Sequence, residues 1–84
     1  MPKINKTTAK ALNIPDKSLQ TILFNREHWN LMSARQWLKN HGYQFKEYRY
    51  TKNQIRFWQT PDIINASFYA KQLPNNIILI FQEY

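Results

Sequence analysis

Residues 29–59 constrain the fold most, because the pattern of an amphipathic helix is followed directly by two strand patterns. Asn30 is a favourable N-cap residue, and apolar residues recur after it at helical spacing from Leu31 to Leu38. Gly42, the only glycine of the chain, stands where a residue in the left-handed conformation would end this helix. The sequence therefore predicts a helix that begins after Asn30 and ends before Gly42.

Strand patterns surround this helix. Five runs are rich in β-branched and apolar residues, at 18–25, 44–50, 53–60, 67–73 and 77–81. In the first run, strict alternation predicts that Leu19 and Leu23 share one face and that Ile22 and Phe24 share the other. The second and third runs are separated only by residues 51 and 52, which predicts a β-hairpin. The last run is apolar on both faces, as in a central strand or a subunit interface.

Together these patterns predict an α+β fold. One amphipathic helix packs on a small, mostly antiparallel sheet, in the order β-α-β-β-β-β. A chain of 84 residues makes one small domain, which we place at residues 18–84. Residues 1–17 carry four lysines against one aspartate without a sustained apolar period, which predicts a basic flexible arm. One helical turn around residues 8–12 can rest Ala9 and Leu12 on the domain.

Charge and composition restrict the class of protein. The chain carries 12 basic against 5 acidic residues, a net charge of +7, which is typical of small domains that bind phosphate or another anionic surface. Solubility alone is the alternative explanation. Cysteine is absent, so disulfides and thiolate metal sites are excluded. The amino terminus lacks an apolar leader and the longest apolar run is too short for a bilayer, which predicts an intracellular soluble protein that is not secreted.

Support for catalysis is weak. His28 and His41 flank the predicted helix at opposite ends and cannot easily share one metal ion. His41, near the helix C-terminus, is expected to contact unpaired carbonyl groups there. A hydrolase that uses Glu47 or Asp62 is a remote alternative. We therefore predict a non-enzymatic protein with no cofactor and no metal ion.

The second strand of the hairpin carries the strongest functional pattern. Ile55 and Phe57 alternate with Arg56 and Trp58, so one face is directed to the core and the other presents an arginine beside a tryptophan. Aromatic rings stack on bases, and cations bind the phosphates between them. The alternative is that the aromatic rings pack under the helix or the arm, with Arg56 extended over them.

Two further features extend this pattern. Tyr48 and Tyr50 share a face of the first hairpin strand and can add stacking platforms. Arg35 and Lys39 stand four residues apart on the helix as a cationic stripe, for which a solvated helix face is the alternative. The candidate nucleic-acid-binding residues are Arg56, Trp58, Arg49, Lys46, Arg35, Lys39, Lys3, Lys6 and Lys10.

Residues 22–81 resemble a short domain that recurs in uncharacterised proteins of tailed bacteriophages and large eukaryotic DNA viruses. Its pattern reads Ala-Arg/Lys-x-Trp-Leu-x-x-His-Gly-Tyr, then Thr-Lys-Asn and Arg-Phe-Arg-Gln. The matching positions are Ala34, Arg35, Trp37, Leu38, His41, Gly42, Tyr43, Thr51, Asn53, Arg56, Phe57 and Gln59. Trp58 replaces the second arginine of that pattern, and Asn75-Asn76 replaces its glycine before the last strand. The resemblance implies a viral setting, in the host cytoplasm or the virion, and carries no known activity.

We predict a virus-encoded module that binds nucleic acid, DNA rather than RNA, or packages a genome. Its contacts are directed to phosphates and are largely independent of base sequence, because the basic residues are dispersed and no recognition helix is evident. The alternative is a structural virion or assembly protein. Its exposed aromatic residues and C-terminal apolar strand would then bind an acidic viral protein or a second copy of the chain.

Overall fold

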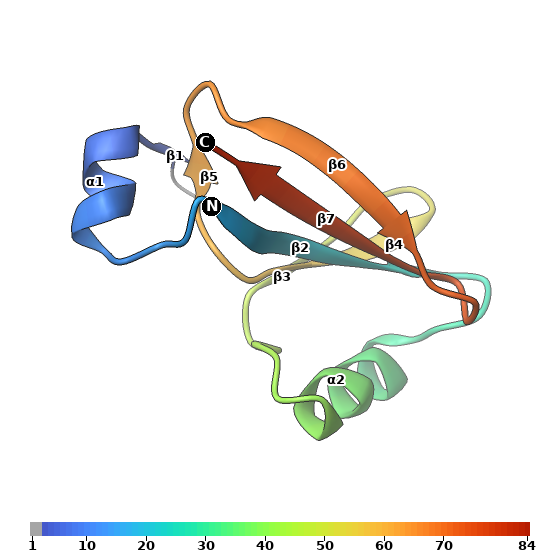
Figure 1. The fold of residues 1–84 in the computed structure, drawn as a ribbon. Coiled ribbons are helices and arrows are strands. Elements are labelled where there is room, and N and C mark those ends of the chain that lie inside the picture. The colour runs from blue at the N-terminus through green and yellow to red at the C-terminus, as the bar shows by residue number, and fades with distance from the viewer. Residues whose placement is uncertain (1–2) are drawn as a thin grey trace.

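A computed structural model describes residues 3–84, in which a five-stranded sheet carries one longer helix on one face (Figure 1). Across the sheet the strands are β3 (Tyr48–Tyr50), β4 (Gln54–Trp58), β2 (Lys17–Asn25), β7 (Ile77–Glu83) and β6 (Ser67–Gln72). Each neighbouring pair is antiparallel. Helix α2 (Leu31–Asn40) follows β2 and leads to β3. The predicted α+β fold, with its helix on a mostly antiparallel sheet, is confirmed.

Both predicted ends of α2 are also confirmed. The side chain of Asn30 accepts a hydrogen bond from the Ser33 amide at 2.8 Å, and the Ser33 hydroxyl accepts one from the Asn30 amide at 3.1 Å. These two bonds satisfy amide groups that have no partner within the helix. At the other end, His41 Nδ1 donates to the carbonyl oxygen of Trp37 at 2.8 Å. Gly42 follows with φ of +76°, a conformation that side-chain-bearing residues rarely adopt.

The core lies between α2 and one face of the sheet, which we call the covered face. Its buried residues are Ile22, Phe24, Ala34, Leu38, Ile55, Phe57 and Ile77. The ring of Phe24 sits at the centre and meets the rings of Trp29, Trp37 and Phe57 edge to face, at centroid distances of 5.1, 5.8 and 5.5 Å. Of these contacts, the one between Phe24 and Trp37 joins α2 to the sheet, and the buried Ala34 and Leu38 of the helix pack into the same core.

A β-bulge interrupts the alternation of β2 between Leu19 and Thr21. Leu19 pairs with Phe81 and packs against the core on the covered face, whereas Leu23 lies on the opposite face. The prediction that Leu19 and Leu23 share a face is therefore wrong. The bulge inserts one extra residue, Gln20, whose side chain donates to Asp62 and accepts from the Thr21 hydroxyl.

The segment predicted as an arm holds two short elements that pack against the rest of the chain. Strand β1 (Lys3–Ile4) pairs in parallel with β5 (Asp62–Ile63), and helix α1 (Lys6–Ala11) follows. Asn5 caps α1, since its side chain accepts from the Thr8 amide at 2.7 Å. Ala9 is fully buried, as expected. Leu12 was also expected to rest on the domain, but its side chain is 58% exposed. The prediction for residues 1 and 2 lies outside the described part of the chain.

Glutamine side chains shorten the predicted hairpin. The run expected at 44–50 becomes a strand only at Tyr48, because Gln44 turns its side chain onto the backbone. Its oxygen accepts from the amides of Lys46 and Glu47, and its nitrogen donates to the carbonyl of Trp58 at 2.7 Å. The side chain of Gln59 in turn bonds both the amide and the carbonyl of Gln44, each at 2.9 Å. Side-chain amides thus replace ladder bonds at the entrance to β3.

Candidate functional site on the open face of the sheet

The strand registers define one row of side chains across the face of the sheet opposite α2, which we call the open face. Arg49 pairs with Arg56, Arg56 with Leu23, Leu23 with Ile78, and Ile78 with Gln72. The next row holds Trp58, Thr21, Ile80 and Ala70. Because neighbouring strands lie about 4.8 Å apart, the first row extends over roughly 19 Å and the second, which has no residue from β3, over roughly 14 Å. The predicted alternation of β4, with Ile55 and Phe57 in the core and Arg56 and Trp58 outside it, is confirmed.

Arg56 stands between a second cation and an aromatic ring. Its Cζ lies 5.5 Å from the centroid of the Trp58 ring, two residues along the same strand. Arg49 is its direct partner on β3, and like charges in that position destabilise a sheet. The Nε–H of Arg56 is buried and has no hydrogen-bond partner within residues 3–84. An anion on this face would reduce the repulsion between the two arginines and offer oxygen acceptors to their donors.

A hollow of about 490 Å³ opens on this face beside Arg56. Its lining residues are Gln20, Leu23, Thr51, Gln54, Arg56, Asp62, Phe68 and Ile80. Leu23 and Ile80 are half-buried, and Phe68 is 51% exposed, so apolar surface adjoins the cation. Asp62 is the one acidic group of this lining, and its carboxylate accepts from Gln20. The hollow therefore combines a guanidinium group, an aromatic ring and aliphatic surface.

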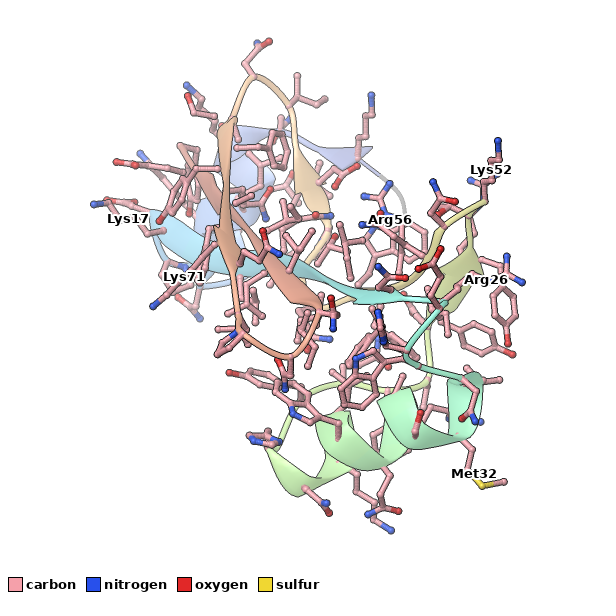
Figure 2. The ribbon with its side chains drawn as sticks, turned by 90° about the vertical axis from the view of Figure 1, so that its right-hand side faces the viewer. Lys17, Arg26, Met32, Lys52, Arg56 and Lys71 are labelled. Carbon is pink, nitrogen blue, oxygen red and sulfur yellow. The ribbon has the colours of Figure 1, made fainter. Side chains whose placement is uncertain are left out.

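Further cations gather where the β3–β4 hairpin turns. Arg26 donates from Nη1 to the carbonyl of Thr51 at 2.8 Å, and its Cζ lies 5.0 Å from the centroid of the Tyr50 ring. Figure 2 shows Arg26 and Lys52 at this end of the molecule, with Arg56 on the side of the sheet away from α2. No local pattern in the sequence marks Arg26 as a binding residue, because the contact that places it beside Tyr50 depends on tertiary structure.

The predicted tyrosine platforms lie on the other side of the sheet from Trp58. Tyr48 pairs with Phe57 in the register, so Tyr48 and Tyr50 leave β3 on the covered face. The Tyr48 ring lies 5.7 Å from that of Phe57 and 5.9 Å from that of Tyr50. The two tyrosines share a face, as expected, but they do not form one surface with Trp58.

The remaining predicted residues do not join Arg56. Arg35 and Lys39 are exposed on α2, which covers the opposite face of the sheet. Lys3 lies in β1, while Lys6 and Lys10 lie in α1, all exposed. Lys46 is exposed in the loop before β3. Of the predicted residues, the structure thus brings Arg49 and Trp58 together with Arg56, and it places Lys3 beside Asp62 and Phe68 at the border of the hollow. It adds Gln20, Leu23, Asp62, Phe68 and Ile80, which no sequence motif had marked as binding residues.

Geometry gives no support to the hydrolase alternative. Asp62 bonds an amide side chain, and Glu47 is an exposed residue outside the hollow. Within residues 3–84, His, Cys, Asp and Glu form no group of three that could hold a metal ion. None of the helices over the same residues has the length and apolar character needed to cross a membrane.

The chain matches no protein-family model, no curated protein and no solved structure.

Proposed function

We propose that this protein binds single-stranded nucleic acid on the open face of its sheet, with phosphate contacts that do not depend on base sequence. The cross-strand pair of Arg49 and Arg56, with Trp58 beside it, carries the proposal. Arginine donates to phosphate through a planar fork of N–H groups, and two adjacent guanidinium groups can hold neighbouring phosphates. The net charge of +7 attracts the same polyanion from a distance.

The shape of the face favours a single strand over a duplex. Bases of a single strand are free to stack on side chains such as Trp58 and Phe68, and each stacked base contributes about 1–3 kcal/mol. A duplex is read mainly by an element that enters its major groove, and α2 lies on the other side of the sheet. The row of apolar residues between Arg56 and β6 offers bases a surface that a duplex would not contact.

We also propose that the protein is virus-encoded, because its sequence resembles domains of tailed bacteriophages and large eukaryotic DNA viruses. On that basis DNA is the expected nucleic acid, and genome packaging or handling of viral single strands is the expected process. Phosphate-directed contacts suit this role, because a packaging or strand-coating protein meets every sequence of the genome.

Fluorescence anisotropy with a labelled oligothymidine of about 16 nucleotides tests this proposal. We expect binding at low salt that weakens steeply as salt rises, because counterions are released from each contacted phosphate. A hairpin duplex of equal phosphate number should bind more weakly than the single strand. Absence of binding at low salt, or binding with no salt dependence, would overturn the proposal.

The exposed edge strand favours a second candidate function, protein assembly. All six residues of β6 are exposed, including Phe68 and Tyr69 at 51% and 45%. Among residues 3–84, β6 pairs only with β7, so its outer edge offers unpaired backbone groups to another strand. Light scattering over a range of protein concentrations separates the candidates. A mass that rises with concentration without nucleic acid supports assembly, and a constant monomer mass supports the first proposal.

A further inference from the structure

A second hollow, of about 500 Å³, lies along α2 between the helix and Phe45 of the loop before β3, on the covered side of the sheet. Its lining residues are Leu31, Met32, Arg35, Gln36, Lys39 and Phe45, and we call it the α2 groove. Met32 is 82% exposed, and Figure 2 shows it pointing away from the sheet. A flexible, polarisable methionine at this exposure is common on surfaces that adapt to an apolar partner.

Cations border the apolar part of the α2 groove. The Cζ of Arg35 lies 5.8 Å from the centroid of the Phe45 ring, and Lys39 follows one helical turn later. Helix α2 contains no acidic residue, and no carboxylate lines the groove. Apolar side chains in the groove and positive charges at its border together match a ligand that is apolar on one side and acidic beside it.

We propose that the α2 groove binds an acidic amphipathic helix of a partner protein. Leucine or phenylalanine side chains at helical spacing would fill the space between Met32 and Phe45, as in other helix-in-groove complexes. Glutamate or aspartate residues on the flanks of that helix would meet Arg35 and Lys39. Electrostatic complementarity of this kind fixes the orientation of a partner and excludes basic competitors.

Charge also excludes other occupants of the groove. A symmetric contact between two copies would place the positively charged α2 groove of one copy against the same positively charged groove of the other, with no acidic side chain to offset the repulsion. The 84 residues hold only five acidic side chains, dispersed along the chain, so none of its own segments has the required pattern.

Three synthetic peptides of about 15 residues test the proposal by NMR titration of the isotopically labelled 84-residue chain. One has leucines at helical spacing and glutamates elsewhere, one replaces each glutamate with lysine, and one scrambles the acidic sequence. We expect the acidic helix to bind about tenfold or more tightly than the other two. Its chemical-shift changes should centre on Met32, Arg35, Lys39 and Phe45.

A charge reversal makes the test decisive. The double variant Arg35→Glu with Lys39→Glu should prefer the lysine peptide, whereas Arg49→Glu with Arg56→Glu on the open face should leave the preference for the acidic peptide unchanged. All four sites are exposed or half-buried, and circular dichroism confirms that each variant is folded. Equal binding of the scrambled peptide, shifts centred elsewhere, or shifts at the groove that arise from self-association or from oligothymidine would each overturn the proposal.

Discussion

Arg49 and Arg56 are direct partners in the register of β3 and β4, so their side chains leave the same face of the sheet. Directly opposed like charges reduce the stability of an antiparallel pair by a few tenths to about 1 kcal/mol. Nε of Arg56 is also buried without a hydrogen-bond partner within the described residues, which costs the fold further stability. Under the proposed function, the phosphates of a bound strand offset the repulsion between the two guanidinium groups. A substitution that removes one of the two positive charges should therefore weaken the binding of nucleic acid and raise the free energy of unfolding.

The variant Arg49→Glu tests that opposition. It converts the repulsive pair into an attractive one, so the free energy of unfolding should rise by a few tenths to about 1 kcal/mol. Affinity for oligothymidine should fall about tenfold, because one phosphate contact becomes repulsive. Urea unfolding and anisotropy measure the two effects on the same sample. A variant that loses stability, or that keeps its affinity, would contradict the account.

Trp58 should report directly on bound bases. Trp29 donates its Nε1–H to the carbonyl of Asn75, and Trp37 stacks on His41, so both lie on the α2 side of the sheet. Only Trp58 among the three tryptophans lies on the open face. Oligothymidine should quench the fluorescence of the natural chain, and Trp58→Phe should remove most of that quenching while retaining most of the affinity.

The companion variant Trp58→Ala removes the stacking surface altogether. It should weaken binding by about 1–3 kcal/mol, the contribution of one stacked base. If Trp58→Ala binds as tightly as the natural chain, stacking on this ring plays no part.

The hydrogen bonds between the Gln59 side chain and the Gln44 backbone should contribute to the stability of the fold and not to the affinity for nucleic acid. Gln59→Ala removes two hydrogen bonds, from the Gln44 amide and to the Gln44 carbonyl. The free energy of unfolding should fall by roughly 1–3 kcal/mol. The affinity of the folded protein for oligothymidine should stay the same in salt-matched buffer. A change of less than about 0.5 kcal/mol would show that water replaces both bonds.

Ala70→Pro separates assembly from nucleic-acid binding. The ladder bond from the Leu73 amide to the Ile77 carbonyl sets the alternation of β6, so the amide of Ala70 points to the outer edge. Proline at such an edge position removes no ladder bond and blocks pairing with another strand. We expect the affinity for oligothymidine to change by less than about twofold, because Ala70 lies at the end of its row farthest from Trp58 and carries no charge or ring. A drop in mass by light scattering in this variant would instead support the assembly function.

Several features of the site follow from the sequence because they depend on local rules. The Asn30 cap and the left-handed Gly42 set the ends of α2 by hydrogen bonding and backbone conformation alone. The alternation of Ile55 and Phe57 with Arg56 and Trp58 follows from the two-residue period of a strand. These rules predicted which residues of β4 face outward, and the structure agrees.

Other features depend on contacts between distant segments, and local rules could not predict them. The bulge at Gln20 moves Leu19 to the covered face, and its hydrogen bond to Asp62 joins residues 42 positions apart. The face taken by Tyr48 depends on its pairing with Phe57. The parallel pairing of β1 with β5 likewise joins two-residue strands that have no periodicity to detect.

The most direct test of the account compares two double variants of equal charge. Arg49→Gln with Arg56→Gln and Arg35→Gln with Lys39→Gln each lower the net charge by two, on opposite sides of the sheet. The measurement is oligothymidine affinity as a function of salt concentration. For the open-face variant we predict a large loss of affinity and a salt slope reduced by about 1.4, that is about 0.7 for each lost phosphate contact. The α2 variant should keep nearly the natural slope, and equal losses in both variants would contradict a binding site on the open face.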